Sequence, residues 1–277
     1  MGDLTAPIQW PAEAIWEDVS PLLPSFSVEV LPEVDSTNTE LMRRAKAGQV
    51  EPILLVAEKQ TAGRGRLGRD WHDLAAKTPA SLPALTFSLG LPLSPQDWSG
   101  LSLAVGVSVA QSLHPAIGLK WPNDLWLKER KLAGILIETA VFNGQRYAVI
   151  GVGINICEPA PMSVSSPETA LRTPPAWLQE LLPHISAPDA LLRVVPPLIQ
   201  TALAFEAYGF APFQVRFNAL DVLRDRTVTL HDGQANLSDT ARTLGSAHGV
   251  NESGALMVHT GSGMQLVSSS EVSVRPF

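Results

Sequence analysis

Short apolar runs, separated by polar and turn residues, make up most of the chain as far as about residue 155. Runs of this length that are rich in Val, Ile and Leu predict β-strands, whereas the longer stretch Trp98–Leu113 predicts a buried helix. Further helices are expected at Ala176–Leu182, Asp189–Tyr208 and Pro212–Leu220. The expected strands are Ile53–Glu58, Ala84–Leu89, Ile117–Trp121, Leu125–Leu127, Gly134–Val141 and Tyr147–Ile154. The pattern predicts an α+β fold, a mixed β-sheet flanked by helices.

The pattern changes after Asp221, where short alternating strands follow one another across Gly and Asn turns. This spacing predicts a small β-barrel over residues 223–277, next to a larger domain over residues 25–222. Residues 1–24 are rich in proline, and we expect an extended leader with one short helix near Ala12–Val19. The strands expected in the small domain are Thr227–His231, Asp239–Ser246, Ala255–His259 and Gln265–Val267.

Composition narrows the class of protein. The chain has 277 residues, of which 45% are hydrophobic, and this is enough for a sizeable core. A lone cysteine, Cys157, excludes an intramolecular disulfide, and the acidic segment Met1–Val19 lacks the positive charge of a signal peptide. The apolar stretch Leu101–Leu113 is too short to span a bilayer. We therefore expect a soluble cytoplasmic protein without a membrane partner, and the net charge of −7 disfavours DNA as the main partner.

The segment from Ala62 to Trp71 carries the densest group of glycines and arginines in the chain. Glycines let backbone amides approach an anion, and arginines supply charge and forked donors, so the segment suits a polyanionic ligand. A plain basic surface hairpin is the alternative. The segment also spells a dinucleotide-binding fingerprint, but the expected acidic residue is absent from the window Thr86–Leu91. Its candidate residues are Gly63, Arg64, Gly65, Arg66, Gly68 and Trp71.

Ser36 and Thr37 mark the start of a helix that Gly48 closes. Either residue is a good N-cap, and Glu40 lies three residues after Thr37, in the register of a capping box. The free amides and hydroxyls of such a helix start also suit a polar ligand.

Three further motifs follow in order: residues 119–125 (LKWPNDL), residues 130–138 (RKLAGILIE) and residues 149–156 (VIGVGINI). Together with the glycine-rich segment and the helix start at Ser36, they closely resemble the biotin protein ligases from about Ser25 to the C-terminus. The resemblance implies a catalytic domain like that of class II aminoacyl-tRNA synthetases and a C-terminal SH3-like barrel. Residues 1–24 are too few for the helix-turn-helix domain of the repressor branch, so the chain resembles the ligase-only branch.

The resemblance implies a reaction in two halves. The carboxylate of biotin attacks ATP to give biotinyl-5′-AMP and pyrophosphate, and a lysine of a biotin carboxyl carrier protein then takes the acyl group. Two unit charges about 4 Å apart repel by about 4 kcal/mol at an effective dielectric near 20, so cations must lie between the reactants. By resemblance Lys131, Arg64 and Arg66 are the catalytic residues. The implied biotin contacts are Ser36, Thr37, Gln60, Arg64, Arg66, Lys131 and Gly134, and the implied ATP contacts are Gly63, Gly65, Gly68, Trp71, Asn123, Asn155 and Arg275.

Each of these roles has a structural alternative. Asn123 and Asp124 follow Pro122 and fit an Asx turn, although two oxygen-bearing side chains beside a triphosphate also suit Mg²⁺, and the resemblance favours Asp124 as the metal-linked residue. Trp71 is either a core residue or the platform on which adenine stacks. Asn155 is either a strand-end cap or a nucleotide contact. Arg275 either reaches the nucleotide or lies on the surface.

Three other functions remain as alternatives at this point. A lipoate or octanoate ligase shares the fold, a DNA-binding repressor is disfavoured by the acidic charge, and a protein that only sequesters biotinyl-AMP would not need Lys131 and Asp124. Biotin, ATP and the carrier protein of acetyl-CoA carboxylase are the implied partners. The sequence does not decide whether the protein forms a homodimer, and it does not show the purpose of the insertion His72–Pro83.

Overall fold

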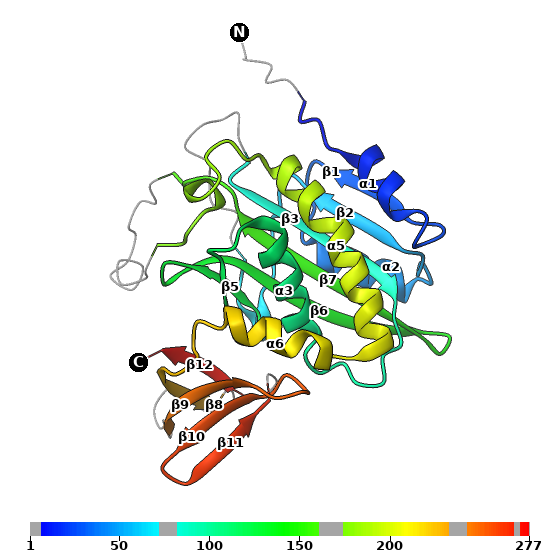
Figure 1. The fold of residues 1–277 in the computed structure, drawn as a ribbon. Coiled ribbons are helices and arrows are strands. Elements are labelled where there is room, and N and C mark those ends of the chain that lie inside the picture. The colour runs from blue at the N-terminus through cyan, green and yellow to red at the C-terminus, as the bar shows by residue number, and fades with distance from the viewer. Residues whose placement is uncertain (1–6, 72–81, 161–173, 233–242, 269–271, 277) are drawn as a thin grey trace.

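A seven-stranded mixed sheet forms the centre of the larger domain in the computed structural model (Figure 1). The structure describes residues 7–71, 82–160, 174–232, 243–268 and 272–276. The strand order is β1-β2-β3-β7-β6-β5-β4, with β1 parallel to β2 and the other neighbours antiparallel. The strands are β1 (Ser27–Leu31), β2 (Ile53–Ala57), β3 (Ala84–Pro92), β4 (Gly118–Lys120), β5 (Asp124–Leu127), β6 (Arg130–Phe142) and β7 (Gln145–Asn155).

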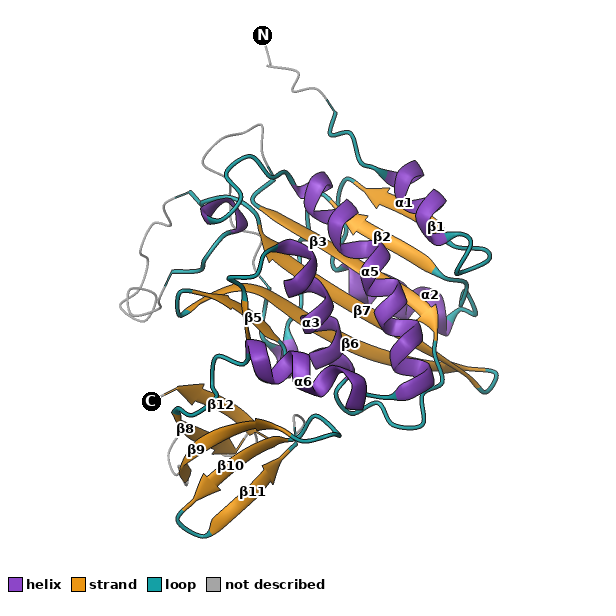
Figure 2. Ribbon diagram, viewed as in Figure 1, coloured by secondary structure: helices purple, strands orange, loops and turns teal. Residues whose placement is uncertain are grey.

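Helices cover both faces of this sheet (Figure 2). The helices α3 (Leu101–Leu113), α5 (Ala187–Tyr208) and α6 (Ala211–Leu220) lie on one face, and α2 (Thr37–Lys46) packs on the other against β3, β6 and β7. The predicted layers are therefore confirmed. By length and composition α5 could cross a membrane, but it packs against α3 with one apolar face buried in the main core, as a core helix does.

One prediction was wrong in this domain, and one strand was missed. The segment Ala176–Leu182 forms only a short 3-10 turn, Leu178–Glu180, and β1 was not expected at all. The helix α1 (Ala12–Val19) lies where we expected one, but Ile15 and Val19 are fully buried in the main core. This part of the expected leader therefore belongs to the packed domain.

Alternation along the central strands separates the core from the site. Leu85, Phe87 and Leu89 of β3 point into the core with α3 and α5, whereas Thr86 and Ser88 point to the opposite face. In register, Ser88 lies opposite Gly151 of β7, which lies opposite Leu136 of β6. Near the start of α2 this face therefore carries several small and polar residues, such as Thr86, Ser88 and Gly151, and this leaves room for a ligand.

The C-terminal domain is a five-stranded antiparallel sheet in the order β11-β10-β9-β8-β12. Its strands are β8 (Thr227–Asp232), β9 (Thr243–Val250), β10 (Leu256–Thr260), β11 (Gly263–Val267) and β12 (Val272–Pro276). The prediction of short strands is confirmed, and β12 is an addition to it. The start of the predicted strand Asp239–Ser246 lies outside the described residues.

Candidate active site

The start of α2 provides a buried polar corner. Ser36 is the N-cap, and its hydroxyl accepts from the amide of Thr39 at 3.4 Å. Ser36 and Thr37 are only 2% and 3% exposed. The expected capping box is not formed, because the N-cap is Ser36 rather than Thr37 and Glu40 therefore lies one residue beyond the required position. Glu40 pairs instead with Arg43 and Arg44.

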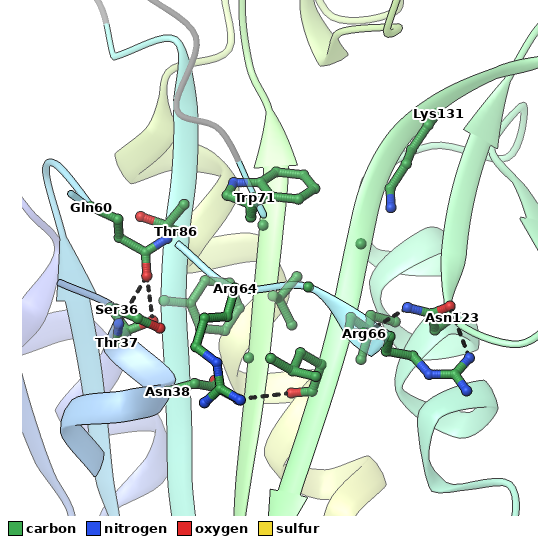
Figure 3. Close-up of a pocket in the computed structure, with 18 residues that line it drawn as sticks. Ser36, Thr37, Asn38, Gln60, Arg64, Arg66, Trp71, Thr86, Asn123 and Lys131 are labelled. Atoms are coloured by element: carbon green, nitrogen blue, oxygen red, sulfur yellow. Dashed lines mark hydrogen bonds between the residues drawn. The ribbon is translucent and has the colours of Figure 1, made fainter. Parts of the chain in front are cut away.

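Residues outside the helix hold this corner in place. Gln60 Oε1 accepts from the amide of Thr37 at 2.8 Å and lies 3.2 Å from the Thr37 hydroxyl oxygen (Figure 3). Asp35 accepts from the amide of Ser36 at 2.8 Å and pairs with Arg43 at 2.6 Å. The hydrogen bond from Arg43 holds the pKa of Asp35 below its usual value, so this carboxylate is charged at neutral pH.

The glycine-rich segment forms a small hairpin, not the turn of a dinucleotide-binding fold. The backbones of Arg64 and Asp70 form an antiparallel β-bridge, and the amide of Trp71 donates to the carbonyl of Gly63 at 2.9 Å. A 3-10 turn at Arg66–Gly68 forms the tip of the hairpin. Antiparallel pairing of β2 with β3 excludes the parallel βαβ unit that the fingerprint requires. Gly63 is required because a Cβ there would come within 2.5 Å of the carbonyl oxygen of Trp71.

Trp71 lies directly on the sheet, over two paired glycines. Gly134 of β6 is opposite Gly153 of β7, and a Cβ on Gly153 would lie 2.5 Å from the Trp71 indole. The Lys131 ammonium is 5.7 Å from the ring centre. Figure 3 shows the ring between the corner around Thr37 and the group around Lys131. The indole nitrogen is buried and has no hydrogen-bond partner among the described residues.

A cationic group lies at the other end of the cleft. The Lys131 Nζ is 2.7 Å from Asp124 Oδ1, and Arg66 Nη1 donates to Asn123 Oδ1 at 3.4 Å. Asn123 is itself fixed by donating to the carbonyl of Ile135 at 2.8 Å. Burial lowers the pKa of Arg66, while the charge of Asp124 opposes this effect. A lysine, an arginine and one carboxylate thus lie at the same end of the cleft, and the two cations suit a triphosphate or a carboxylate ligand.

These residues line one open cleft of about 450 Å³. Of the predicted site residues it contains Ser36, Thr37, Gln60, Arg64, Gly65, Arg66, Trp71, Asn123, Lys131 and Gly134. Asp124 does not line the cleft itself but forms an ion pair with Lys131, which does. Gly63 and Gly68 belong to the hairpin beside the cleft.

Of the two remaining predicted nucleotide contacts, only Asn155 has a described side chain. Asn155 donates to the carbonyls of Ala176 and Lys131, at 3.0 and 3.4 Å, and so joins neighbouring backbone segments. Arg275 is in β12 opposite Thr229, and its side chain lies outside the described part of the structure, as does most of the insertion His72–Pro83. Nucleotide contacts by Asn155 and Arg275 stay predictions.

Several polar residues of the cleft region were not predicted from the sequence. Asn38 and Thr86 line the cleft, and Ser88 and Glu138 are hydrogen-bonded to Asn38. Thr86 and Ser88 could have been recognised from the alternation in β3, where a residue with a hydroxyl follows each large apolar residue from Leu85 to Ser88. Glu138 ends the conspicuous motif at residues 130–138 but has no local feature that distinguishes it from a surface carboxylate.

Comparison with known proteins places this architecture in a family. Residues 30–155 match the Biotin/lipoate A/B protein ligase family, and residues 236–275 match the Biotin protein ligase C terminal domain. A biotin–[acetyl-CoA-carboxylase] ligase of Paracoccus denitrificans is 30% identical over 88% of this chain and 98% of its own length. The chain belongs to the biotin protein ligases.

Other relatives of this ligase agree in sequence and fold. A biotin–[acetyl-CoA-carboxylase] ligase of Mycobacterium tuberculosis is 40% identical over 52% of this chain and 54% of its own. The bifunctional ligase/repressor of Escherichia coli is 33% identical over 90% of this chain and 74% of its own. The solved structure of the Aquifex aeolicus ligase in complex with biotin and ATP superposes with a TM-score of 0.69, at 27% identity over 90% of this chain and 99% of that one.

Proposed function

We propose that this ligase activates biotin with ATP and transfers it to a lysine of a carrier protein. The observation that carries the proposal is the meeting, in one cleft, of the buried corner at Ser36 and Thr37 with the cations Arg64, Arg66 and Lys131. A polar, uncharged ring system fits the corner, and a carboxylate beside a triphosphate fits the cationic end. The Aquifex aeolicus structure holds biotin and ATP together, which supports the same pair of substrates here.

In the first half-reaction an oxygen of the biotin carboxylate forms a bond to the α-phosphorus of ATP. The bond from that phosphorus to its bridging oxygen breaks, and pyrophosphate leaves. Arg64, Arg66 and Lys131 lower the repulsion between the two anions and the charge that develops at phosphorus. Trp71 offers an aromatic face to the adenine, and Gly134 and Gly153 let the ligand and the indole approach the backbone.

In the second half-reaction the amine of the carrier lysine attacks the acyl carbon of biotinyl-5′-AMP. The amide bond forms, AMP leaves with the electron pair of the broken mixed-anhydride bond, and the amine loses a proton. Lys131 lies where it can hold the negative charge of the departing phosphate. The names of the Paracoccus and Mycobacterium relatives point to a carrier of acetyl-CoA carboxylase as the acceptor.

Magnesium fits this site as an ion carried mainly by the nucleotide. No group of three or more His, Cys, Asp or Glu side chains able to hold a metal occurs among the described residues. Asp124 can offer a carboxylate oxygen beside the one that faces Lys131, and Mg²⁺ takes most of its other ligands from phosphate and water. When bound, the ion would neutralise charge on the triphosphate.

The same proposal includes the relation of the two domains to known folds, the oligomeric state and the cellular location. The five-stranded C-terminal sheet supports an SH3-like domain, and helices on both faces of a mixed sheet support a relation to class II synthetases. Among the described strands, β6 from Ile137 onward pairs with β7 alone, so this part of its other edge is available for the homodimer that the resemblance allows. We expect a cytoplasmic location and no operator DNA as partner.

Pyrophosphate exchange into ATP tests the proposal directly. Biotin and lipoate are supplied separately at equal concentration with Mg²⁺, and exchange is expected with biotin alone. Exchange with lipoate alone would instead favour the lipoate ligase, and none with either would favour a protein that only binds the adenylate. Transfer of labelled biotin to a carrier domain, against the same domain with its acceptor lysine changed to arginine, then tests the second half-reaction.

A further inference from the structure

A chain of buried hydrogen bonds leads from the start of α2 across the sheet. Ser88 Oγ lies 2.6 Å from Asn38 Oδ1 and 2.7 Å from Thr37 Oγ1. A hydroxyl has one hydrogen and an amide oxygen can only accept, so Ser88 donates to Asn38, and the Thr37 hydroxyl serves as the donor to Ser88. All three side chains are at most 3% exposed. The corner that would hold the head of biotin is therefore fixed from beneath.

Glu138 is the far end of this chain. Asn38 Nδ2 donates to the carbonyl of Leu136 at 3.3 Å and to Glu138 Oε2 at 3.0 Å. Both partners are acceptors, which fixes the orientation of the Asn38 amide. A Cβ on Gly151 would lie 2.1 Å from Asn38 Oδ1, so the absence of a side chain at Gly151 is what lets the amide reach Ser88 and Glu138 at once.

The same carboxylate also holds the glycine-rich hairpin. Arg64 Nη1 donates to Glu138 Oε1 at 3.0 Å and lies 3.3 Å from Oε2. The Glu138 side chain is 22% exposed, while that of Arg64 is 49% exposed and lines the cleft. A well-fixed anion thus positions a more mobile cation. The hairpin holds the backbone of Arg64 through its bridge to Asp70, and Glu138 holds the Arg64 side chain.

We propose that Glu138 is a positioning residue for the adenylation step, acting through Arg64; this rests on the proposed function. The pair orders the guanidinium at the wall of the cleft before the substrate carboxylate arrives. Ordering an arginine side chain lowers its conformational entropy, and a partner that has already ordered it removes this penalty from substrate binding. Because Glu138 also holds Asn38 beside the start of α2, one carboxylate sets the distance between the polar corner at Thr37 and the guanidinium of Arg64.

A simple surface ion pair is the competing explanation, and three substitutions distinguish the two. Glu138→Gln removes the charge, Glu138→Asp keeps the charge on a shorter side chain, and Glu33→Gln removes an exposed pair with Lys59 as a matched control. We expect Glu138→Gln to lower kcat/KM for biotin in pyrophosphate exchange about 10-fold, Glu138→Asp to recover part of that loss, and Glu33→Gln to leave the rate unchanged. A wild-type rate in Glu138→Gln would overturn the proposal.

A double-mutant cycle shows whether Glu138 acts through Arg64. In the background Arg64→Ala, the substitution Glu138→Gln is expected to cause no further loss of rate. Equal losses in both backgrounds would assign Glu138 a role unrelated to Arg64 and would overturn the proposal.

The difference in binding between biotin and its carboxamide distinguishes a positioning role of Glu138 from a merely structural one. Calorimetry with biotin and with its neutral carboxamide is expected to show weaker binding of biotin alone in Glu138→Gln, since Arg64 faces the carboxylate end. Equal weakening of both ligands would mean that Glu138 only supports the fold around Asn38. If the wild-type protein binds biotin but gives no exchange, the proposed function fails, and the difference between biotin and its carboxamide still decides the position of Glu138.

Discussion

The pair between Lys131 and Asp124 makes Lys131 the residue whose loss should affect chemistry most. Its Nζ lies 2.7 Å from Asp124 and lines the cleft beside Trp71. We expect Lys131→Ala to lower the single-turnover rate of biotinyl-AMP formation about 100-fold, the usual scale for one transition-state donor. Lys128→Ala is the control, because Lys128 is exposed and lies 3.9 Å from Glu180. A Lys131→Ala rate near that of the wild type would remove Lys131 from the catalytic group.

Asp221 gives the protein a dependence of stability on pH. Its Oδ1 accepts from the amide of Leu223 at 2.9 Å, and its Oδ2 is buried without a partner among the described residues. Burial raises its pKa from 3.8 to about 6, while the Leu223 hydrogen bond and Arg224 oppose the rise. The folded protein therefore binds this proton more tightly than the unfolded chain. The resulting stability is fully present below about pH 4 and is lost as pH rises through about 6.

Asp221→Asn should therefore stabilise the protein at neutral pH. The asparagine oxygen can keep the bond from Leu223, and the buried charge is gone. We expect the free energy of unfolding at pH 7.5 to rise by about 1 to 2 kcal/mol, with a much smaller change at pH 4. Urea unfolding at the two pH values measures both. A variant that loses stability at pH 7.5 would mean that the charged form has a stabilising partner.

At the scale of elements, the strands that carry the site depend on glycine. A Cβ on Gly153 would lie 2.5 Å from the Trp71 ring, so Gly153→Ala must displace the indole from the sheet. Because the ring is the proposed adenine platform, we expect KM for ATP to rise about 10-fold and KM for biotin to rise less. Gly261→Ala is the control, since no atom lies within 4 Å of its added Cβ. A larger effect on biotin than on ATP would contradict the assignment of Trp71.

The sequence predicted elements with strong patterns and missed those defined by their neighbours. The strands β2, β3 and β7 were predicted because each is a continuous apolar run. The strand β1 was missed because it is a short edge strand that contains a charged residue, Glu29, which pairs with Arg44 of α2. The segment Ala176–Leu182 has helical composition but forms only a 3-10 turn, and its start donates from Ala176 to the carbonyl of Lys131. Tertiary contacts outweighed local preference in both places.

The candidate site divides in the same way. Residues in recognisable local motifs, such as Ser36, Arg64 and Lys131, were predicted and do line the cleft. Ser88 and Glu138 were missed because their roles come from contacts with Asn38, distant along the chain. A sequence pattern shows which residues lie near one another in the chain, but hydrogen bonds across a sheet depend on register, which only the fold supplies.

At the scale of the whole molecule, one buried hydrogen bond links the small domain to the site. Trp121 Nε1 donates to the carbonyl of Gly254 at 3.1 Å, and Trp121 is 1% exposed. The residues that follow it, through the cis bond to Pro122, are Asn123 and Asp124 of the cleft region. Further links between the domains are an exposed pair between Arg226 and Glu129 at 2.9 Å and hydrogen bonds from Gln214 and Asn218 of α6 to Val250.

Trp121→Phe should therefore weaken both the fold and nucleotide use. It removes the donor, leaves the Gly254 carbonyl without that partner and opens a small cavity, so we expect a loss of about 2 to 4 kcal/mol of stability. The KM for ATP should rise several-fold, because Asn123 and Asp124 lose a fixed neighbour. Trp16→Phe is matched in chemistry, since Trp16 also donates to a backbone carbonyl at 3.1 Å, but it is 49% exposed and distant from the cleft lining. Calorimetric unfolding and exchange kinetics on both variants measure the two effects, and equal changes in the two would show that the small domain does not position the site.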